Sequence, residues 1–225
     1  MATLLGFTVP AKASAVATYL VPGTTVKLTL ARDVAPLLLA VARDFDREVE
    51  ELIKGQCGGF NPRKIAGTEK WSRHAIAAAI DLNWLKHPMG RRNTFSPAKQ
   101  DKIRAILRRY THKGVQVIRW GGAYSTPDDM HFEVNVPRAA AVAAVKALQK
   151  PRKPAPAGGP KPGDRTLRQG ASGPDVAYLQ RWVGAEDDGK FGQQTRLRVI
   201  RYQKIVGVPA TGVADSKTWA KILGR

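Results

Sequence analysis

Two segments of the sequence carry side chains whose types suit metal-assisted hydrolysis. His74, Asp81 and His131 offer two imidazoles and one carboxylate, and Asp128 lies three residues before the second histidine. Three protein ligands, an open fourth position for water and a nearby carboxylate base are the components of a catalytic zinc site. Single histidines are more often structural than metal-binding, so these residues alone leave both interpretations open. The two segments read SRHAIAAAID over 72–81 and DDMHFE over 128–133.

The spacing of His74 and Asp81 restricts the structures that could bring both to one ion. Seven residues along a straight helix separate two side chains by about 10 Å, whereas each zinc ligand lies only about 2 Å from the metal. On a straight strand an odd separation places the two side chains on opposite faces. We therefore expect a turn near His74 and then a strand over 76–82 that carries Asp81, although the alanines there favour a helix.

The second segment fits a strand over 130–136. On such a strand His131 and Glu133 share one face, because alternate residues point the same way. Asp128 then falls in the loop before the strand, where a carboxylate could reach a water on the metal without being a ligand. The other two histidines, His87 and His112, are expected at the surface or in loops.

A proline-, glycine- and lysine-rich run divides the chain. Residues 150–163 read KPRKPAPAGGPKPG, a composition typical of an exposed, semi-rigid linker. We expect a larger domain over 1–149, a linker over 150–164 and a smaller domain over 165–225.

Apolar periodicity predicts mixed helices and strands in the larger domain. A helix over 34–52 has Asp33 as its candidate N-cap, and a helix over 96–110 has Ser96 as its N-cap. Because no βαβ rhythm connects the elements, we expect an α+β fold with a small antiparallel sheet and flanking helices. The remaining elements expected in this domain are strands over 115–120 and 130–136 and a helix over 139–148.

The smaller domain is predicted to be all-α, with helices over 174–183, 193–206 and 215–223. A weak internal echo connects its two turn regions. Gly189 precedes Thr195 by the same interval as Gly212 precedes Thr218.

Charge is the unusual bulk property. The 225 residues carry 37 Lys and Arg against 18 Asp and Glu, a net charge of +19. Such a surface favours polyanions, which leaves nucleic acid, anionic membranes and anionic cell walls as candidate partners. The single cysteine, Cys57, excludes an intramolecular disulfide and a cysteine-based zinc cluster. No segment is long and apolar enough to span a membrane, and the N-terminus lacks the features of a signal peptide.

The first segment resembles a known family motif. His74-x-x-Ala77-x-Ala79-x-Asp81, preceded by Ser72, is similar to the S-x-H-x-x-G-x-A-x-D pattern of the D-alanyl-D-alanine carboxypeptidase (VanY-like) and L-alanyl-D-glutamate peptidase family. The family's glycine is replaced by Ala77, a small change that removes no ligand.

The second segment, Asp128-x-x-His131, is similar to the family's second motif, and the resemblance covers roughly residues 30–137. The position after Gly121-Gly122, where an acidic residue is expected, is Ala123. Further segments that resemble phage endolysins of this group are Arg63-x-Ile65-x-Gly67, Asp81-Leu82-Asn83, Lys86-His87-Pro88-Met89-Gly90 and Trp120-Gly121-Gly122.

The resemblance implies a role for each of these residues. His74, Asp81 and His131 would bind Zn²⁺, and Asp128 would be the catalytic base. Arg63 would bind a substrate carboxylate or form a surface salt bridge, since its planar guanidinium group suits both interactions. Ser72 would hydrogen-bond the substrate or brace its loop.

Residues 165–223 resemble the three-helix peptidoglycan-binding domain found on many wall hydrolases. The aromatic residues Phe191, Tyr202 and Trp219 are expected in the core of this domain. The resemblance is carried by Leu167-Arg168-x-Gly170-x-x-Gly173-Pro174-x-Val176-x-x-Leu179-Gln180, Asp188-Gly189-x-Phe191-Gly192-x-x-Thr195, Tyr202-Gln203, Thr211-Gly212-Val213 and Thr218-Trp219.

Together the resemblances imply a zinc-dependent peptidoglycan peptidase of the phage endolysin type, which cuts the host wall for lysis. L-Ala–D-Glu is the expected bond, while D-Ala–diaminopimelate cross-links and terminal D-Ala–D-Ala stay open. A non-catalytic wall-binding protein is the alternative of another class. Nucleic-acid binding is disfavoured, because aromatic residues do not alternate with basic ones as a stacking platform needs.

The expected partners are peptidoglycan and anionic wall polymers, and a monomer is expected, without nucleic acid and without stable membrane insertion. Lacking a signal peptide, the enzyme would stay in the host cytoplasm until its release to the wall at lysis.

Overall fold

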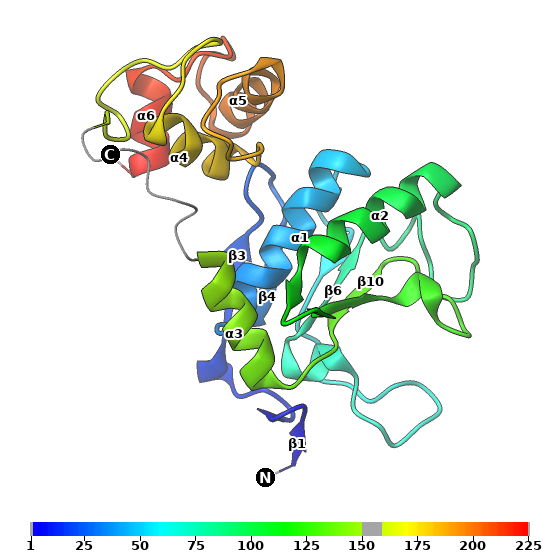
Figure 1. Cartoon of the computed structure of the whole chain (residues 1–225). Coiled ribbons are helices and arrows are strands. Elements are labelled where there is room, and N and C mark those ends of the chain that lie inside the picture. Colours follow the sequence, from blue (N-terminus) through cyan, green and yellow to red (C-terminus); the bar gives the residue numbers. More distant parts are fainter. Residues whose placement is uncertain (1, 150–158, 225) are drawn as a thin grey trace. The chain divides into compact units, whose positions relative to one another are not determined.

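The protein is described here by a computed structural model for residues 2–149 and 159–224. The chain forms two compact units, one drawn from residues 1–150 and one that includes residues 151–225 (Figure 1). Residues 150–158 of the predicted linker lie outside the described residues. Within the described ranges no helix is both long and apolar enough to cross a bilayer.

A four-stranded antiparallel sheet forms the centre of the N-terminal unit. Its order is β5-β6-β10-β9, so β6 and β10 are the inner strands. Phe132 of β10 lies opposite Ile80 of β6 and opposite Trp120 of β9. The strands span Cys57–Gly58 (β5), Ala79–Leu82 (β6), Ile118–Trp120 (β9) and His131–Val134 (β10).

Three helices and three two-stranded pairs complete this unit. Helices α1, α2 and α3 are visible around the sheet in Figure 1, and α1 contacts both α2 and β6. The α+β prediction is therefore confirmed. The helices span Ala35–Glu48 (α1), Pro97–Arg109 (α2) and Arg138–Gln149 (α3), with short 3₁₀ turns at Ala13–Ala15, Arg73–Ile76 and Gly121–Ala123. The pairs are Thr3–Leu4 (β1) with Phe7–Thr8 (β2), Val16–Leu20 (β3) with Lys27–Ala31 (β4), and Thr111–His112 (β7) with Val115–Gln116 (β8).

The core lies where these helices meet the sheet. Phe45 of α1 contacts Phe95 and Phe132 edge to face, with both ring centroids 5.8 Å away. All three rings are at most 1 % exposed. Edge-to-face pairs contribute about 0.5–1.5 kcal/mol each beyond their area burial. This aromatic cluster fixes α1 against β10, which carries His131.

Two helix predictions differ from the structure at their ends. The first helix stops at Glu48, not at residue 52, because the Asp46 carboxylate accepts the backbone N–H of Leu52 and folds the chain back. Asp33 does not cap it, since the N-cap position is Val34 and has no side-chain bond. The predicted N-cap Ser96 is confirmed.

The predicted strand over 115–120 is interrupted. Val117 separates β8 from β9, and its backbone N–H bonds to Tyr110 instead of to a strand partner. The carbonyl of Val117 accepts the backbone N–H of Asn135. The side chain of Val117 is 0 % exposed, so the interruption between β8 and β9 lies in the core.

Glu48 joins the end of α1 to α2 through a bidentate ion pair. Nη1 and Nη2 of Arg109 donate to the two carboxylate oxygens, at 2.6 Å each. Burial raises the pKa of Glu48, but hydrogen bonds from Arg109 and Arg47 outweigh it and lower the pKa from 4.5 to about 2.

We expect the stability of the protein to fall as the pH drops from 4.5 towards 2. The folded-state pKa is lowered, so the stabilisation is fully present above the unfolded value and is lost as the unfolded chain takes up its proton first. Glu48→Gln should be less stable at pH 7 and should lose less on acidification. Urea unfolding across this window measures both effects. Asp101→Asn, which removes an exposed carboxylate, is the matched control, and equal acid slopes in both variants would contradict the prediction.

Over residues 159–224, the C-terminal unit contains three helices, as predicted. Their bounds are Pro174–Val183 (α4), Gln193–Val206 (α5) and Ser216–Leu223 (α6), with Asp215 as the N-cap of the last. Phe191, Tyr202 and Trp219 are buried in a shared core, as expected of them.

A buried glutamine on α4 holds the turn that follows. Gln180 is 1 % exposed, and its Nε2 donates to the Lys190 carbonyl and the Thr195 hydroxyl, at 3.0 Å each. Its Oε1 accepts the backbone N–H of Gly189 at 2.9 Å. The side chain thereby satisfies backbone groups that the turn leaves open.

The same arrangement occurs again on α5. Gln203 is 0 % exposed, and its Nε2 donates to the Val213 carbonyl and the Thr218 hydroxyl, while its Oε1 accepts from Gly212. Each Gly–Thr pair thus encloses one buried glutamine amide. The echo seen in the sequence is a repeated hydrogen-bonding unit.

Gln180→Ala and Gln203→Ala are each expected to destabilise the C-terminal unit by roughly 1–3 kcal/mol, because buried backbone groups lose their partners. Gln194→Ala, at an exposed position of α5, should change stability by no more than about 0.5 kcal/mol. Chemical denaturation of the full chain, followed through the amide NMR signals of α4 to α6, separates these cases. Equal midpoints for all three variants would contradict the prediction.

Candidate metal centre

His74 lies in a 3₁₀ turn just before β6. The Ser72 hydroxyl caps this turn by accepting the backbone N–H of His74 at 3.2 Å. Ala77 ends the turn in the left-handed conformation, with φ of 54°. An L-residue costs about 1–2 kcal/mol there, which explains why glycine suits this motif position. The predicted turn and strand are confirmed, but the strand begins at Ala79 and not at residue 76.

Strand register brings the other two ligand candidates together. His131 of β10 lies directly opposite Asp81 of β6. Directly opposed residues of an antiparallel pair have Cβ atoms about 4.5–5.5 Å apart on one face of the sheet. The imidazole and the carboxylate therefore meet, although the two residues lie far apart in sequence.

The three side chains converge on one point. His74 Nε2 lies 3.1 Å from His131 Nδ1 and 3.2 Å from Asp81 Oδ2. His131 Nδ1 lies 2.9 Å from Asp81 Oδ1. Tetrahedral ligands at about 2.0–2.1 Å from zinc are separated by about 3.3 Å, so this donor set matches the spacing that zinc needs. Among the described residues this is a group of three ligand atoms within 4.8 Å of one another.

Hydrogen bonds behind the histidines orient the ring nitrogens towards this point. His74 Nδ1 donates to the Gly59 carbonyl at 2.6 Å, which leaves the lone pair on Nε2. His131 Nε2 lies 3.0 Å from Glu133 Oε2, so Nδ1 is the ring nitrogen that faces the other two ligand candidates. Arg119 donates to the other oxygen of Glu133 at 2.5 Å. Such outer partners fix tautomer and ring orientation in metal sites.

No role for Glu133 was predicted from the sequence. The available signal was its position two residues after His131, on the same face of a strand. Only the pairing of β10 with β9, which brings Arg119 opposite Glu133, shows that this carboxylate is held in place.

Hydrogen bonds among these side chains shift the pKa values of two ligand candidates. Burial raises the pKa of Asp81, but hydrogen bonds from His131 and His74 hold it well below its usual range. Burial lowers the pKa of His131, yet hydrogen bonds to Asp81 and Glu133 raise it to about 9. Without metal the site therefore keeps a proton that a metal ion would displace.

Asp128 lies beside the three ligand candidates without joining them. Its Oδ1 is buried and has no hydrogen-bond partner within the described ranges. Burial raises the pKa of this carboxyl above its usual value. Gly121 leaves room for it, since a Cβ there would lie 2.5 Å from the Asp128 carbonyl and 3.2 Å from His131 Cβ.

The two predicted substrate residues differ in position. Arg63 is exposed, and its charge is near enough to lower the pKa of Asp128 in part. Ser72 is only 6 % exposed and is engaged with the backbone of His74. The geometry of Ser72 favours bracing the loop, whereas the Arg63 side chain is exposed to solvent.

Comparison with known proteins defines the class of both units. Residues 66–134, which include the three ligand candidates and Asp128, match the D-alanyl-D-alanine carboxypeptidase family, and residues 172–222 match a peptidoglycan-binding domain. No curated protein and no solved structure matches the chain.

The N-terminal unit thus carries a segment that matches the D-alanyl-D-alanine carboxypeptidase family, and the C-terminal unit carries one that matches a peptidoglycan-binding domain. Both resemblances are confirmed. The combination is that of a cell-wall peptidase that binds bacterial peptidoglycan.

Proposed function

We propose that this protein is a zinc-dependent peptidoglycan peptidase whose metal is bound by His74, Asp81 and His131. The observation that carries the proposal is the convergence of three ligand atoms within 4.8 Å of one another. Bound zinc supplies a Lewis acid and lowers the pKa of a coordinated water towards about 7.

The chain's own residues supply the proton transfers. Asp128, with an unpartnered buried oxygen, takes the proton of the attacking water and passes it to the leaving amine. Arg63, exposed beside Asp128, binds a carboxylate of the stem peptide, which its planar fork suits. Ser72 positions His74 by capping its turn.

The proposed bond is L-Ala–D-Glu, which rests on the resemblance of the chain to the L-alanyl-D-glutamate peptidase family and its phage endolysins. The description of the matched family favours a second candidate, removal of a terminal D-Ala. Cleavage of a D-Ala–diaminopimelate cross-link is the third.

We also propose that the protein works as a monomeric phage endolysin, which reaches the wall from the host cytoplasm at lysis. Its net charge of +19 supports binding to anionic wall polymers. The peptidoglycan-binding domain adds a second contact, and linking two modest binding modules raises the effective concentration at the wall.

One experiment tests both the chemistry and the bond. Purified peptidoglycan is digested with the full chain, with and without a chelator, and the new termini are identified by mass spectrometry. We expect chelator-sensitive cleavage that is restored by Zn²⁺, with a new free D-Glu amine. Released D-Ala would select the carboxypeptidase reaction. Wall binding without cleavage would replace the proposal with a non-catalytic wall-binding protein.

A further inference from the structure

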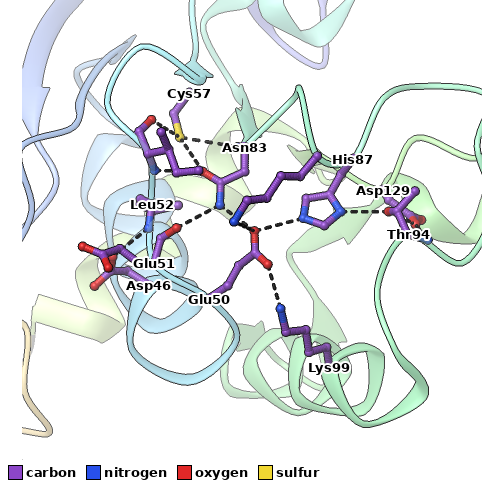
Figure 2. A network of polar contacts seen from close by, with 12 residues as sticks. Asp46, Glu50, Glu51, Leu52, Cys57, Asn83, His87, Thr94, Lys99 and Asp129 are labelled. Atoms are coloured by element: carbon purple, nitrogen blue, oxygen red, sulfur yellow. Dashed lines mark hydrogen bonds and ion pairs between the residues drawn. The ribbon is translucent and has the colours of Figure 1, made fainter.

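A partly buried carboxylate accepts three hydrogen bonds just after α1 ends (Figure 2). Glu50 accepts from Asn83 Nδ2 at 2.6 Å, from His87 Nε2 at 3.0 Å and from Lys99 Nζ at 2.7 Å. Burial raises the pKa of Glu50, but these three partners hold it well below its usual value. Glu50 is therefore an ionised acceptor that joins residues from three segments of the chain.

His87 is the least expected member of this network. It was predicted at the surface or in a loop; it lies in the loop after β6, but it is only 3 % exposed because tertiary packing covers it. Its ring stacks on Phe95, with centroids 3.7 Å apart. Both ring nitrogens are engaged, since Nε2 faces Glu50 and Nδ1 lies 2.9 Å from the Thr94 hydroxyl.

The Thr94 hydroxyl links the His87 ring to Asp129. Its oxygen lies 2.9 Å from His87 Nδ1, and it donates to Asp129 Oδ2 at 2.5 Å. On the other side of the ring, Nε2 faces the Glu50 carboxylate, which can only accept. The ring therefore bridges Glu50 and the Thr94–Asp129 pair.

Both ends of this network lie close in sequence to residues of the metal centre. Asp129 directly follows Asp128, and its Oδ2 also accepts the backbone N–H of Thr94 at 3.0 Å. On the other side, Asn83 follows the end of β6, two residues after Asp81. The network thus connects the strand of one ligand to the loop of the base.

We propose that His87, acting through Thr94 and Asp129, is a positioning residue that holds Asp128 in register with the metal ligands. The inference rests on the proposed function, because it assigns a task within that reaction. His87 touches neither substrate nor ligands. The charged groups that face it are Glu50, Lys99 and, further off, Lys86, whose Nζ is 3.8 Å from Glu50 Oε1.

The Thr94 hydroxyl offers the sharpest test, because it can be removed without a change of shape. Thr94→Val should lower kcat about ten-fold or more, since a misplacement of about 1 Å in an active site costs about 100-fold. KM should stay within about two-fold, because Arg63 and the wall-binding domain remain. Thr94→Ser, which keeps the hydroxyl, should restore kcat, and Thr111→Val, at an exposed threonine, should leave both constants unchanged.

The kinetic outcomes separate the two proposals. A wild-type chain that cleaves peptidoglycan together with a Thr94→Val variant of equal kcat would overturn the positioning role alone. Equal losses in Thr94→Val and Thr94→Ser would overturn it too, because the hydroxyl would then not be the cause. A wild-type chain that does not cleave peptidoglycan would contradict the proposed function instead.

A spectroscopic readout works without activity. Nitrogen-15 NMR of the full chain at pH 7 follows the backbone amides near the metal centre. The amide signals of Asp128 and Asp129 should shift in Thr94→Val and return in Thr94→Ser. Unshifted amides in Thr94→Val would overturn the inference.

Discussion

Replacing His74 with alanine is expected to abolish both zinc binding and peptidoglycan cleavage. The substitution removes one of three converging ligand atoms and leaves a pair that cannot hold the metal tightly. We expect a loss of at least about 1,000-fold in kcat/KM. A loss of this size corresponds to about 4 kcal/mol of transition-state stabilisation. Metal analysis of the dialysed protein and a wall-digestion assay measure the two effects separately.

The matched control for this prediction is His112→Ala. His112 lies in β7 and is absent from the ligand cluster, so the variant should keep its zinc and its activity. The fold of His74→Ala should also survive, because the imidazole makes one bond to the Gly59 carbonyl outside the cluster. A folded His74→Ala chain with full zinc content would rule out the proposed ligand set.

The second large effect is expected from Asp128→Asn. The amide keeps the shape of the carboxylate but cannot take a proton, so kcat should fall by about 10²–10⁴-fold. Zinc content should be unchanged, because Asp128 stands outside the group of three ligands. This combination of retained metal and lost turnover is what distinguishes a base from a ligand.

Asp101→Asn serves as the control for this variant. Asp101 is an exposed carboxylate on α2, so its loss should not change kcat or zinc content. Loss of zinc in Asp128→Asn would instead make Asp128 a ligand. Full activity in that variant would remove it from the mechanism.

Local patterns predicted much of the fold. The helices of the C-terminal unit were predicted almost to the residue, because apolar periodicity, Gly C-caps and an Asp N-cap are local signals. Ser96 was recognised as an N-cap for the same reason. The early end of α1 was missed, since Asp46 turns the chain back through a bond that helix periodicity does not contain.

The spacing of His74 and Asp81 also carried real structural information. It excluded a continuous helix or strand and required a turn, which the structure has as a capped 3₁₀ turn ending at Ala77. The alanines of this segment favour helix locally, but burial between two strands outweighs a propensity difference of less than about 1 kcal/mol per residue.

What the sequence determined by itself was the set of chemical groups: two histidines, one aspartate ligand candidate and a second aspartate near them. The tertiary structure decided how they meet. Strand register places His131 opposite Asp81, pairing with β9 aligns Glu133 with Arg119, and packing buries His87. These relations arise between segments distant in the chain, so no local pattern encodes them. The identity of each residue fixes its chemical group, whereas the geometry of a metal centre depends on which strands pair.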